Sequence, residues 1–279
     1  MTIVKIDVDG KLKPLYMDSN LHRQLFTKVR DNIHKKDKDF VCVVDGMEGA
    51  GKSVFAMQIG KILDPSFDLS RVCMTPDQFT KAIINAKKGQ CIIFDEAFTG
   101  LSSRASLTEI NKIIVSLMME MRQKNLFVLI VMPTIFLLDK YVALWRTKGL
   151  FHVYTKDGKR GRWVYFNNKK KKLLYLIGKK LYDYSNPKSK FRGRFQDQYV
   201  VDESEYRDKK NKALKLKSRV TRSDLYLNQR NILIWILYKQ MNLNQIELMK
   251  LCKESGFNIG RTSISKIISQ KDSQSDSKV

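Results

Sequence analysis

The feature that most constrains this 279-residue chain is segment 46–53, which reads Gly-Met-Glu-Gly-Ala-Gly-Lys-Ser. It fits the phosphate-loop pattern G-x-x-x-x-G-K-[ST] at every position. In that pattern the glycines let backbone N–H groups curl around phosphate oxygens, and the lysine brings positive charge to the β- and γ-phosphates. The apolar run 40–44 before the loop and the helical pattern 54–63 after it predict a strand, a loop and a helix. Phosphates would then lie at a helix N-terminus, which favours anions.

The residues expected to bind a nucleoside triphosphate follow from this pattern. The hydroxyl of Ser53 is expected to help hold Mg²⁺, and Lys52 to act in catalysis as well as in binding. The complete expected set is Gly46, Met47, Glu48, Gly49, Ala50, Gly51, Lys52, Ser53 and Val54.

A second motif downstream supplies two carboxylates. The apolar run 91–94 ends in Asp95 and Glu96, which is the pattern of a Walker B strand. At the carboxyl end of a strand, Asp95 can hold Mg²⁺ directly or through water, and Glu96 can orient and deprotonate an attacking water. We therefore expect ATP and Mg²⁺ as cofactors and hydrolysis as the reaction. The alternative is a nucleotide switch or a kinase, in which Glu96 is only a solvated side chain.

Two further catalytic candidates lie near the next predicted strand, 126–132. That strand is expected beside the strand that ends at Asp95, and Thr134 follows it, where a polar side chain can sense the γ-phosphate. A threonine that only caps a helix or lies in a loop is the alternative. Three arginines are candidates for an arginine finger, within the chain or from a neighbouring subunit. Arg122 is preferred over Arg104 and Arg146 because it lies just before the sensor strand.

The motifs 46–53 and 92–97, with the run from 121 through 134 to 139, resemble the ASCE-type P-loop ATPases (additional strand, catalytic glutamate). Within that class the chain resembles the RecA/HerA–FtsK neighbourhood, which includes Zot-like and viral DNA-packaging ATPases. The resemblance covers residues 38–155. It implies an α/β fold with a mostly parallel, RecA-like sheet covered by helices, and ATP bound between subunits of a homo-oligomer. Many HerA–FtsK members carry a glutamine where this strand ends in Pro133-Thr134, so terminase-like and AAA+-like relatives also fit.

The net charge of +24 is concentrated in one part of the chain. Residues 151–222 hold 22 lysines and arginines against seven acidic residues. A positive field of this kind indicates a polyanionic partner, and DNA is the partner that we expect. A lysine-rich surface or an AT-rich genome is the alternative explanation. The DNA-contacting residues expected in this region are Lys159, Arg160, Arg162, Lys169, Lys170, Arg192 and Arg194.

The C-terminal region predicts three helices, over 228–240, 245–254 and 261–269, with Asn244 as the cap of the second. The glycine-containing turn before the last helix fits a helix-turn-helix, and a small helical bundle for protein contact is the alternative. Expected DNA contacts are Arg261, Thr262, Ser263 and Lys266. The residues expected to face inward are Ile232, Leu233, Ile236, Leu237, Ile246, Leu248, Met249, Cys252, Ile264, Ile267 and Ile268.

The chain is expected to divide into an N-terminal hairpin and helix (1–37), an ATPase core (38–155), a basic hairpin and linker region (156–222), the helix-turn-helix-like region (223–270) and a disordered tail (271–279). No apolar run reaches the roughly 18 residues of a membrane span, so no membrane partner is expected. The four cysteines lack C-x-x-C spacing, which favours free thiols in the cytoplasm over a zinc site.

Three functions are compatible with these features. The first is a Mg-dependent ATPase that translocates, packages or remodels DNA for a virus, a plasmid or another mobile element. The second is an ATP-gated DNA-binding loader or target selector with slow hydrolysis. A small-molecule kinase is less favoured, because Glu96 is placed for water and no lid over an acceptor site is evident. Another protein of the same mobile element is a further candidate partner.

Overall fold

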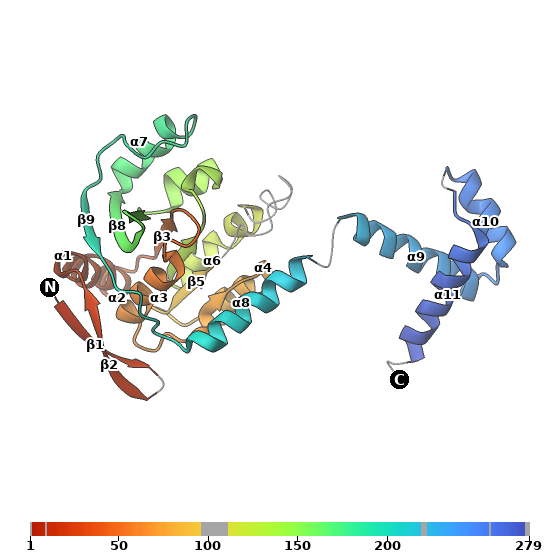
Figure 1. The fold of residues 1–279 in the computed structure, drawn as a ribbon, viewed down its shortest axis with the longest axis horizontal. Coiled ribbons are helices and arrows are strands. Elements are labelled where there is room, and N and C mark those ends of the chain that lie inside the picture. Colours follow the sequence, from red (N-terminus) through yellow and green to blue (C-terminus); the bar gives the residue numbers. More distant parts are fainter. Residues whose placement is uncertain (1, 9, 96–110, 219–221, 257, 277–279) are drawn as a thin grey trace. The chain divides into compact units, whose positions relative to one another are not determined.

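The computed structural model describes residues 2–8, 10–95, 111–218, 222–256 and 258–276 (Figure 1). Its contacts divide the chain into two units, Met1–Leu214 and Lys215–Val279. Glu96 and Arg104, two of the residues singled out above, lie outside the described part. No helix of the described part is long and apolar enough to cross a membrane.

The first unit contains a seven-stranded sheet of the α/β class, mostly parallel. Five strands run parallel in the order β4 (Val72–Cys73), β5 (Cys91–Phe94), β6 (Phe127–Val131), β3 (Phe40–Asp45) and β7 (Gly149–Lys156). The strand predicted at 126–132 therefore pairs with the 91–94 strand, as expected. Two antiparallel strands, β8 (Lys159–Asn167) and β9 (Phe191–Arg194), complete the sheet at the β7 edge.

The position of β8 and β9 corrects one expectation. Residues 156–222 were expected to form a basic hairpin and linker region separate from the core at 38–155. Instead the basic hairpin continues the sheet, because alternate residues of β8, such as Trp163, are buried in the core of the first unit. The basic residues between them lie on the other face of the same strands. A charge count along the sequence does not show this, because successive residues of a strand face opposite sides of the sheet.

Each face of the sheet buries its own set of side chains, as expected for parallel strands covered on both sides. On β3, Cys42 and Val44 belong to one core cluster, and Val41 and Val43 belong to the other. The first cluster is covered by α3 (Lys52–Leu63) and by the N-terminal elements β1 (Thr2–Val8), β2 (Lys11–Met17), α1 (Ser19–Gln24), the π-helical segment η1 (Leu25–Arg30) and α2 (Asp31–Lys35). The second is covered by α4 (Pro76–Asn85), α6 (Met118–Gln123), the 3₁₀ turn η3 (Ile135–Leu137), the π-helical segment η4 (Val142–Arg146) and α7 (Asn168–Gly178).

Helix α8 (Glu203–Ser218) belongs to the first unit as far as Leu214, and several hydrogen bonds attach it to that unit. The Gln58 amide of α3 donates hydrogen bonds to the carbonyl oxygens of Gln196 and Gln198, both at 2.8 Å, and so holds the segment that leads into α8. Lys209 donates to the Leu69 carbonyl at 2.8 Å, next to β4. Tyr206 is buried in the core cluster on the α3 face. The sequence placed this segment in the linker region, because its apolar positions are few.

The second unit is helical where it is described, with α9 (Arg222–Gln240), α10 (Gln245–Glu254) and α11 (Arg261–Asp276). Asn244 caps α10 in a capping box with Glu247, as the sequence predicted for the cap residue. Helix α11 continues through Asp276 and so covers part of the segment 271–279 that was expected to be disordered. The core consists of Ile234, Leu248, Cys252, Ile259, Ile264, Ile267 and Ile268.

Part of the expected inward face of this unit is wrong. Ile232 and Leu233 are exposed, and Ile234 faces the core instead, whereas Leu237 packs against the core as expected. In α10, Ile246 and Met249 are exposed, whereas Leu248 and Cys252 are buried as expected. Residues 232–237 are all apolar, so helical periodicity alone selects no face there, and only the packing partners decide.

Candidate nucleotide-binding site

The glycine-rich loop predicted at 46–53 joins the carboxyl end of β3 to the first turn of α3. Gly46, Gly49 and Gly51 have φ angles of 139°, 74° and 94°, in the region that glycine adopts most readily. A Cβ atom on Gly46 would lie 1.9 Å from the carbonyl oxygen of Val153 on β7. Glycine at position 46 therefore meets a steric need as well as a conformational one, since the loop begins against the neighbouring strand.

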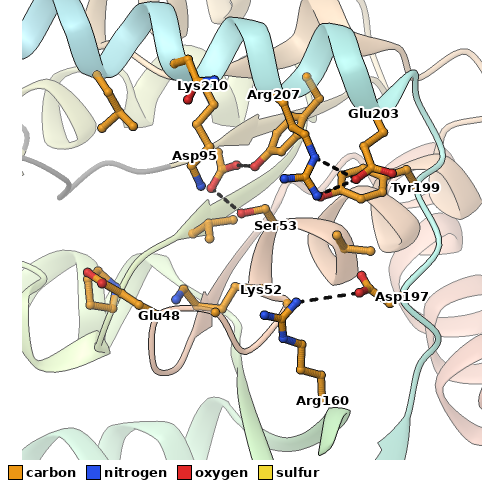
Figure 2. A pocket seen from close by; sticks show the side chains of 18 of the residues that line it. Glu48, Lys52, Ser53, Asp95, Arg160, Asp197, Tyr199, Glu203, Arg207 and Lys210 are labelled. Carbon is orange, nitrogen blue, oxygen red and sulfur yellow. Dashed lines mark hydrogen bonds and ion pairs between the residues drawn. The ribbon is translucent and has the colours of Figure 1, made fainter.

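The two predicted motifs meet at the carboxyl ends of β3 and β5. The Ser53 hydroxyl donates a hydrogen bond to Oδ1 of Asp95 at 2.9 Å, and Asp95 is almost fully buried. The Lys52 ammonium donates to the Met47 carbonyl at 2.8 Å, across the loop. These side chains line a cavity of about 630 Å³, shown in Figure 2. Lys52, Ser53 and Asp95 thus lie where the sequence analysis expected a triphosphate and its cation.

Most of the expected phosphate-binding residues also line this cavity. They are Glu48, Gly49, Gly51, Lys52, Ser53 and Val54, whereas Met47 is exposed and Ala50 is buried. The end of β6 contributes Val131, Met132 and Pro133.

Helix α8 forms a second wall of the cavity, which the sequence analysis did not predict. Figure 2 shows this helix crossing opposite the glycine-rich loop, with charged side chains directed toward it. Its lining residues recur every three or four positions and so lie on one face of the helix. They are Glu203, Tyr206, Arg207, Lys210, Asn211 and Leu214, and the preceding segment adds Asp197 and Tyr199. The helical spacing of polar residues was the available signal, but nothing in the sequence said what that face covers.

Tyr206 connects α8 to Asp95. Its hydroxyl donates a hydrogen bond to Oδ2 of Asp95 at 2.7 Å, while Ser53 occupies Oδ1 of the same carboxylate. Burial and the negative charge of Asp95 both raise the pKa of Tyr206 far above its ordinary value. The hydroxyl therefore stays protonated at neutral pH and acts as a donor.

The cavity carries cations from three elements. Lys52 comes from α3, Arg160 from β8, and Arg207 and Lys210 from α8. Arg207 pairs with Glu203 at 2.6 Å, and Arg160 lies 3.9 Å from Asp197, in both cases with partly exposed side chains. Burial lowers the pKa of Lys52, and the charge of Lys210 lowers it further, against opposing contributions from Asp95 and Asp45. Two lysines that repel each other across a cavity would both be stabilised by an anion between them.

Arg160 is thus placed differently from the other residues predicted to contact DNA. A Cβ on Gly49 would lie 3.8 Å from its guanidinium, so this side chain borders the glycine-rich loop. Arg162 and Arg194 instead face each other directly across β8 and β9, with Arg192 two residues further along β9. We call Arg162, Arg192 and Arg194 the basic strand face. Lys159 is exposed at the β7–β8 turn, and Lys169 and Lys170 lie in the first turn of α7.

Thr134 was expected to sense the γ-phosphate, but the structure places its hydroxyl in another network. Thr134 Oγ1 lies 2.7 Å from the Tyr184 hydroxyl, which donates to Asp45 at 2.5 Å. Asp45, the last residue of β3, is fully buried and also accepts hydrogen bonds from the Ile135 amide and from His152 Nδ1, each at 2.8 Å. Thr134 also caps η3, so the capping role that was its alternative is the one observed. Sequence reasoning missed Asp45, although an acidic residue ending an apolar strand just before the loop was a usable signal.

The arginine-finger candidates lie away from the cavity. Arg122 donates to the Asp37 carbonyl at 2.8 Å, and Arg146 pairs with Asp39 at 2.5 Å. Both acceptors precede β3, so these arginines lie at the amino ends of the parallel strands, opposite the glycine-rich loop. The prediction that Arg122 acts on the nucleotide of its own chain is therefore wrong. A finger that reaches a neighbouring subunit stays a prediction.

The donor set at Ser53 and Asp95 fits Mg²⁺, a hard cation that prefers oxygen ligands. No group of three or more His, Cys, Asp or Glu residues that could hold a metal ion occurs among the described residues. Mg²⁺ is usually held by one or two protein oxygens together with substrate phosphates and water, so two converging oxygen groups suffice.

Comparison of the chain with known proteins adds no assignment to this geometry. No family model and no curated protein matches the sequence.

Proposed function

We propose that this protein is a Mg-dependent ATPase of the P-loop type. The observation that carries the proposal is the convergence of Lys52, Ser53 and Asp95 on one cavity at the carboxyl ends of β3 and β5. The sheet supports the ASCE resemblance in particular, since the additional strand β6 lies between the loop strand β3 and the Asp95 strand β5. A RecA-like arrangement is the specific form of the α/β fold that we infer.

Each residue then has a chemical role. The backbone N–H groups of the loop and of the first turn of α3 bind phosphate oxygens, and Lys52 neutralises charge on the β- and γ-phosphates. Ser53 and Asp95 hold Mg²⁺, which supplies charge stabilisation at the phosphoryl oxygens. Glu96, directly after Asp95 in the sequence, is the residue that we propose orients and deprotonates the attacking water.

DNA is the partner that we propose for the basic surfaces. Like charges directly opposite on paired strands destabilise a sheet, so the facing pair Arg162 and Arg194 favours an anionic ligand. In the second unit, Arg261, Thr262, Ser263 and Lys266 are exposed at the start of α11, the position that contacts bases in a helix-turn-helix. This arrangement supports translocation, packaging or remodelling of DNA for a virus, a plasmid or another mobile element, by a cytoplasmic homo-oligomer.

One observation favours a second candidate, the ATP-gated DNA-binding loader or selector. Helix α8 lines the nucleotide cavity, and the chain passes from it into the helical unit Lys215–Val279. Through this covalent connection, nucleotide occupancy at α8 would be coupled to DNA binding with little turnover.

Phosphate release from Mg-ATP, measured with and without DNA, tests the proposal. We expect DNA to stimulate turnover of the full chain. Lys52→Ala is expected to reduce it on the order of 100-fold, and Lys61→Ala on the same helix serves as the matched control. Glu96→Gln is expected to keep ATP binding and lose hydrolysis. Replacement of the basic strand face by alanine should remove the DNA stimulation and leave basal turnover intact.

The outcomes separate the candidates. Equal turnover with and without DNA contradicts the DNA-coupled ATPase. ATP-dependent DNA binding without appreciable hydrolysis favours the loader. Phosphorylation of an added nucleoside would assign the protein to the kinases.

A further inference from the structure

Both carboxylate oxygens of Asp95 accept hydrogen bonds from hydroxyl groups, which come from opposite walls of the cavity. Ser53 from α3 donates to Oδ1 at 2.9 Å, and Tyr206 from α8 donates to Oδ2 at 2.7 Å. Tyr206 is only 3% exposed and Asp95 is almost fully buried, so the hydrogen bond between them is buried. Each carboxylate oxygen of Asp95, the proposed Mg²⁺ ligand, therefore has a hydroxyl hydrogen-bond donor from one wall.

The rest of α8 presents attractive groups for a triphosphate on the same face. Lys210 lies one helical turn after Tyr206, and its charge interacts with that of Lys52 across the cavity. Figure 2 shows Lys210 directed from α8 into the cavity on the side of Asp95, and Arg207 paired with Glu203 below the same helix. A cation at Asp95 would therefore displace the Tyr206 hydroxyl of this helix. An anion at Lys52 would instead attract Lys210 of the same helix.

We propose that α8 is a nucleotide-responsive lid: Lys210 is a phosphate-binding residue of the same chain, and Tyr206 occupies Asp95 in place of the divalent cation. This inference rests on the proposed function. When Mg-nucleotide binds, Asp95 exchanges the hydrogen bond from Tyr206 for the cation, and α8 shifts while Lys210 keeps it over the phosphates. Helix α8 itself extends past Leu214 into the second unit, so nucleotide occupancy has a covalent route to that unit.

Tyr206→Phe tests the exchange because it keeps the buried ring and removes only the hydroxyl. Binding of a fluorescent ATP analogue is measured with Mg²⁺ and, separately, with EDTA. We expect Tyr206→Phe to bind the Mg-nucleotide about 10-fold more tightly than wild type, since the bond to Asp95 no longer has to be broken. Affinity in EDTA should be unchanged. Tyr199→Phe is the control, since it removes a hydroxyl from the same cavity and leaves the Tyr206–Asp95 bond in place.

Thermal unfolding supplies a readout independent of binding. Without nucleotide, Tyr206→Phe should unfold at a lower temperature than wild type, and at saturating Mg-nucleotide the two should coincide. Lys210→Ala should weaken Mg-nucleotide binding about 10-fold, whereas Lys212→Ala, at an exposed position of the same helix, should not.

The failure of this inference is distinguishable from that of the proposed function. If wild type binds no nucleotide, or binds it equally after Lys52→Ala, both are overturned. If binding depends on Lys52 but Tyr206→Phe leaves the Mg-nucleotide affinity unchanged or weaker, the lid is wrong and the ATPase proposal stands. An equal gain with Mg²⁺ and with EDTA would also overturn the exchange at Asp95.

Discussion

Removal of the Tyr184 hydroxyl should destabilise the first unit through the buried carboxylate of Asp45. Asp45 accepts three hydrogen bonds, from the Ile135 amide, from His152 and from Tyr184, and its side chain is fully buried. The ring of Tyr184 stacks on His152 with centroids 4.0 Å apart, a contact that phenylalanine preserves. Tyr184→Phe therefore isolates the hydroxyl from the packing.

The magnitude follows from the kind of bond that is lost. A hydrogen bond to a buried charged group contributes about 1.5–3 kcal/mol, so we expect a loss of about 2 kcal/mol in the free energy of unfolding. In a unit of this size that corresponds to a fall of about 4–8 °C in Tm. Urea and thermal unfolding measure both quantities. Tyr182→Phe, whose side chain is 55% exposed, should stay within about 0.5 kcal/mol of wild type.

A double-mutant cycle with Thr134→Val completes the test. Because Tyr184 donates to Asp45, the Thr134 hydroxyl donates to Tyr184, and the two substitutions act on one network. We expect their effects to be non-additive by about 1 kcal/mol. A loss below about 0.5 kcal/mol for Tyr184→Phe, equal to its control, would refute the reasoning. A full loss of ATP turnover in Thr134→Val at wild-type stability would restore Thr134 as a sensor.

Two further predictions concern the stability of the first unit. Burial lowers the pKa of Lys171 to about 7 from its ordinary 10.5. Between pH 7 and pH 10.5 the unfolded chain therefore binds more protons than the folded chain, and the free energy of unfolding rises with pH. The rise is on the order of 5 kcal/mol over this pH range. Lys171→Met should abolish that rise in urea unfolding at pH 7–10, and an unchanged slope would contradict it. Gly46→Ala should cost at least about 3 kcal/mol, because its Cβ would meet the Val153 carbonyl, whereas Gly158→Ala, also at positive φ but with open space around it, should cost about 1 kcal/mol. Equal losses in chemical denaturation would show that the contact with β7 is not what requires glycine.

Local sequence patterns predicted several elements of the fold correctly. The N-terminal hairpin, the strand before the glycine-rich loop and the Asn244 cap of α10 are all confirmed. Each depends on interactions within a few residues, such as turn chemistry, strand alternation or a cap. Part of the expected inward face of α9, Ile232 and Leu233, was wrong because the apolar run there is continuous, and only packing against neighbouring helices selects Ile234.

What the sequence by itself determined is the phosphate-loop motif and the carboxylate motif, because a turn that closes around phosphate and an acidic strand end are local patterns. The tertiary structure decided everything that joins them across the sheet. In the folded chain Asp95 lies beside Ser53, and Arg122 lies at the opposite end of the strands. Thr134 contacts Tyr184. The tertiary structure also laid α8 over the loop with Tyr206 on Asp95, a contact between residues 111 positions apart that long-range packing creates and no local pattern encodes.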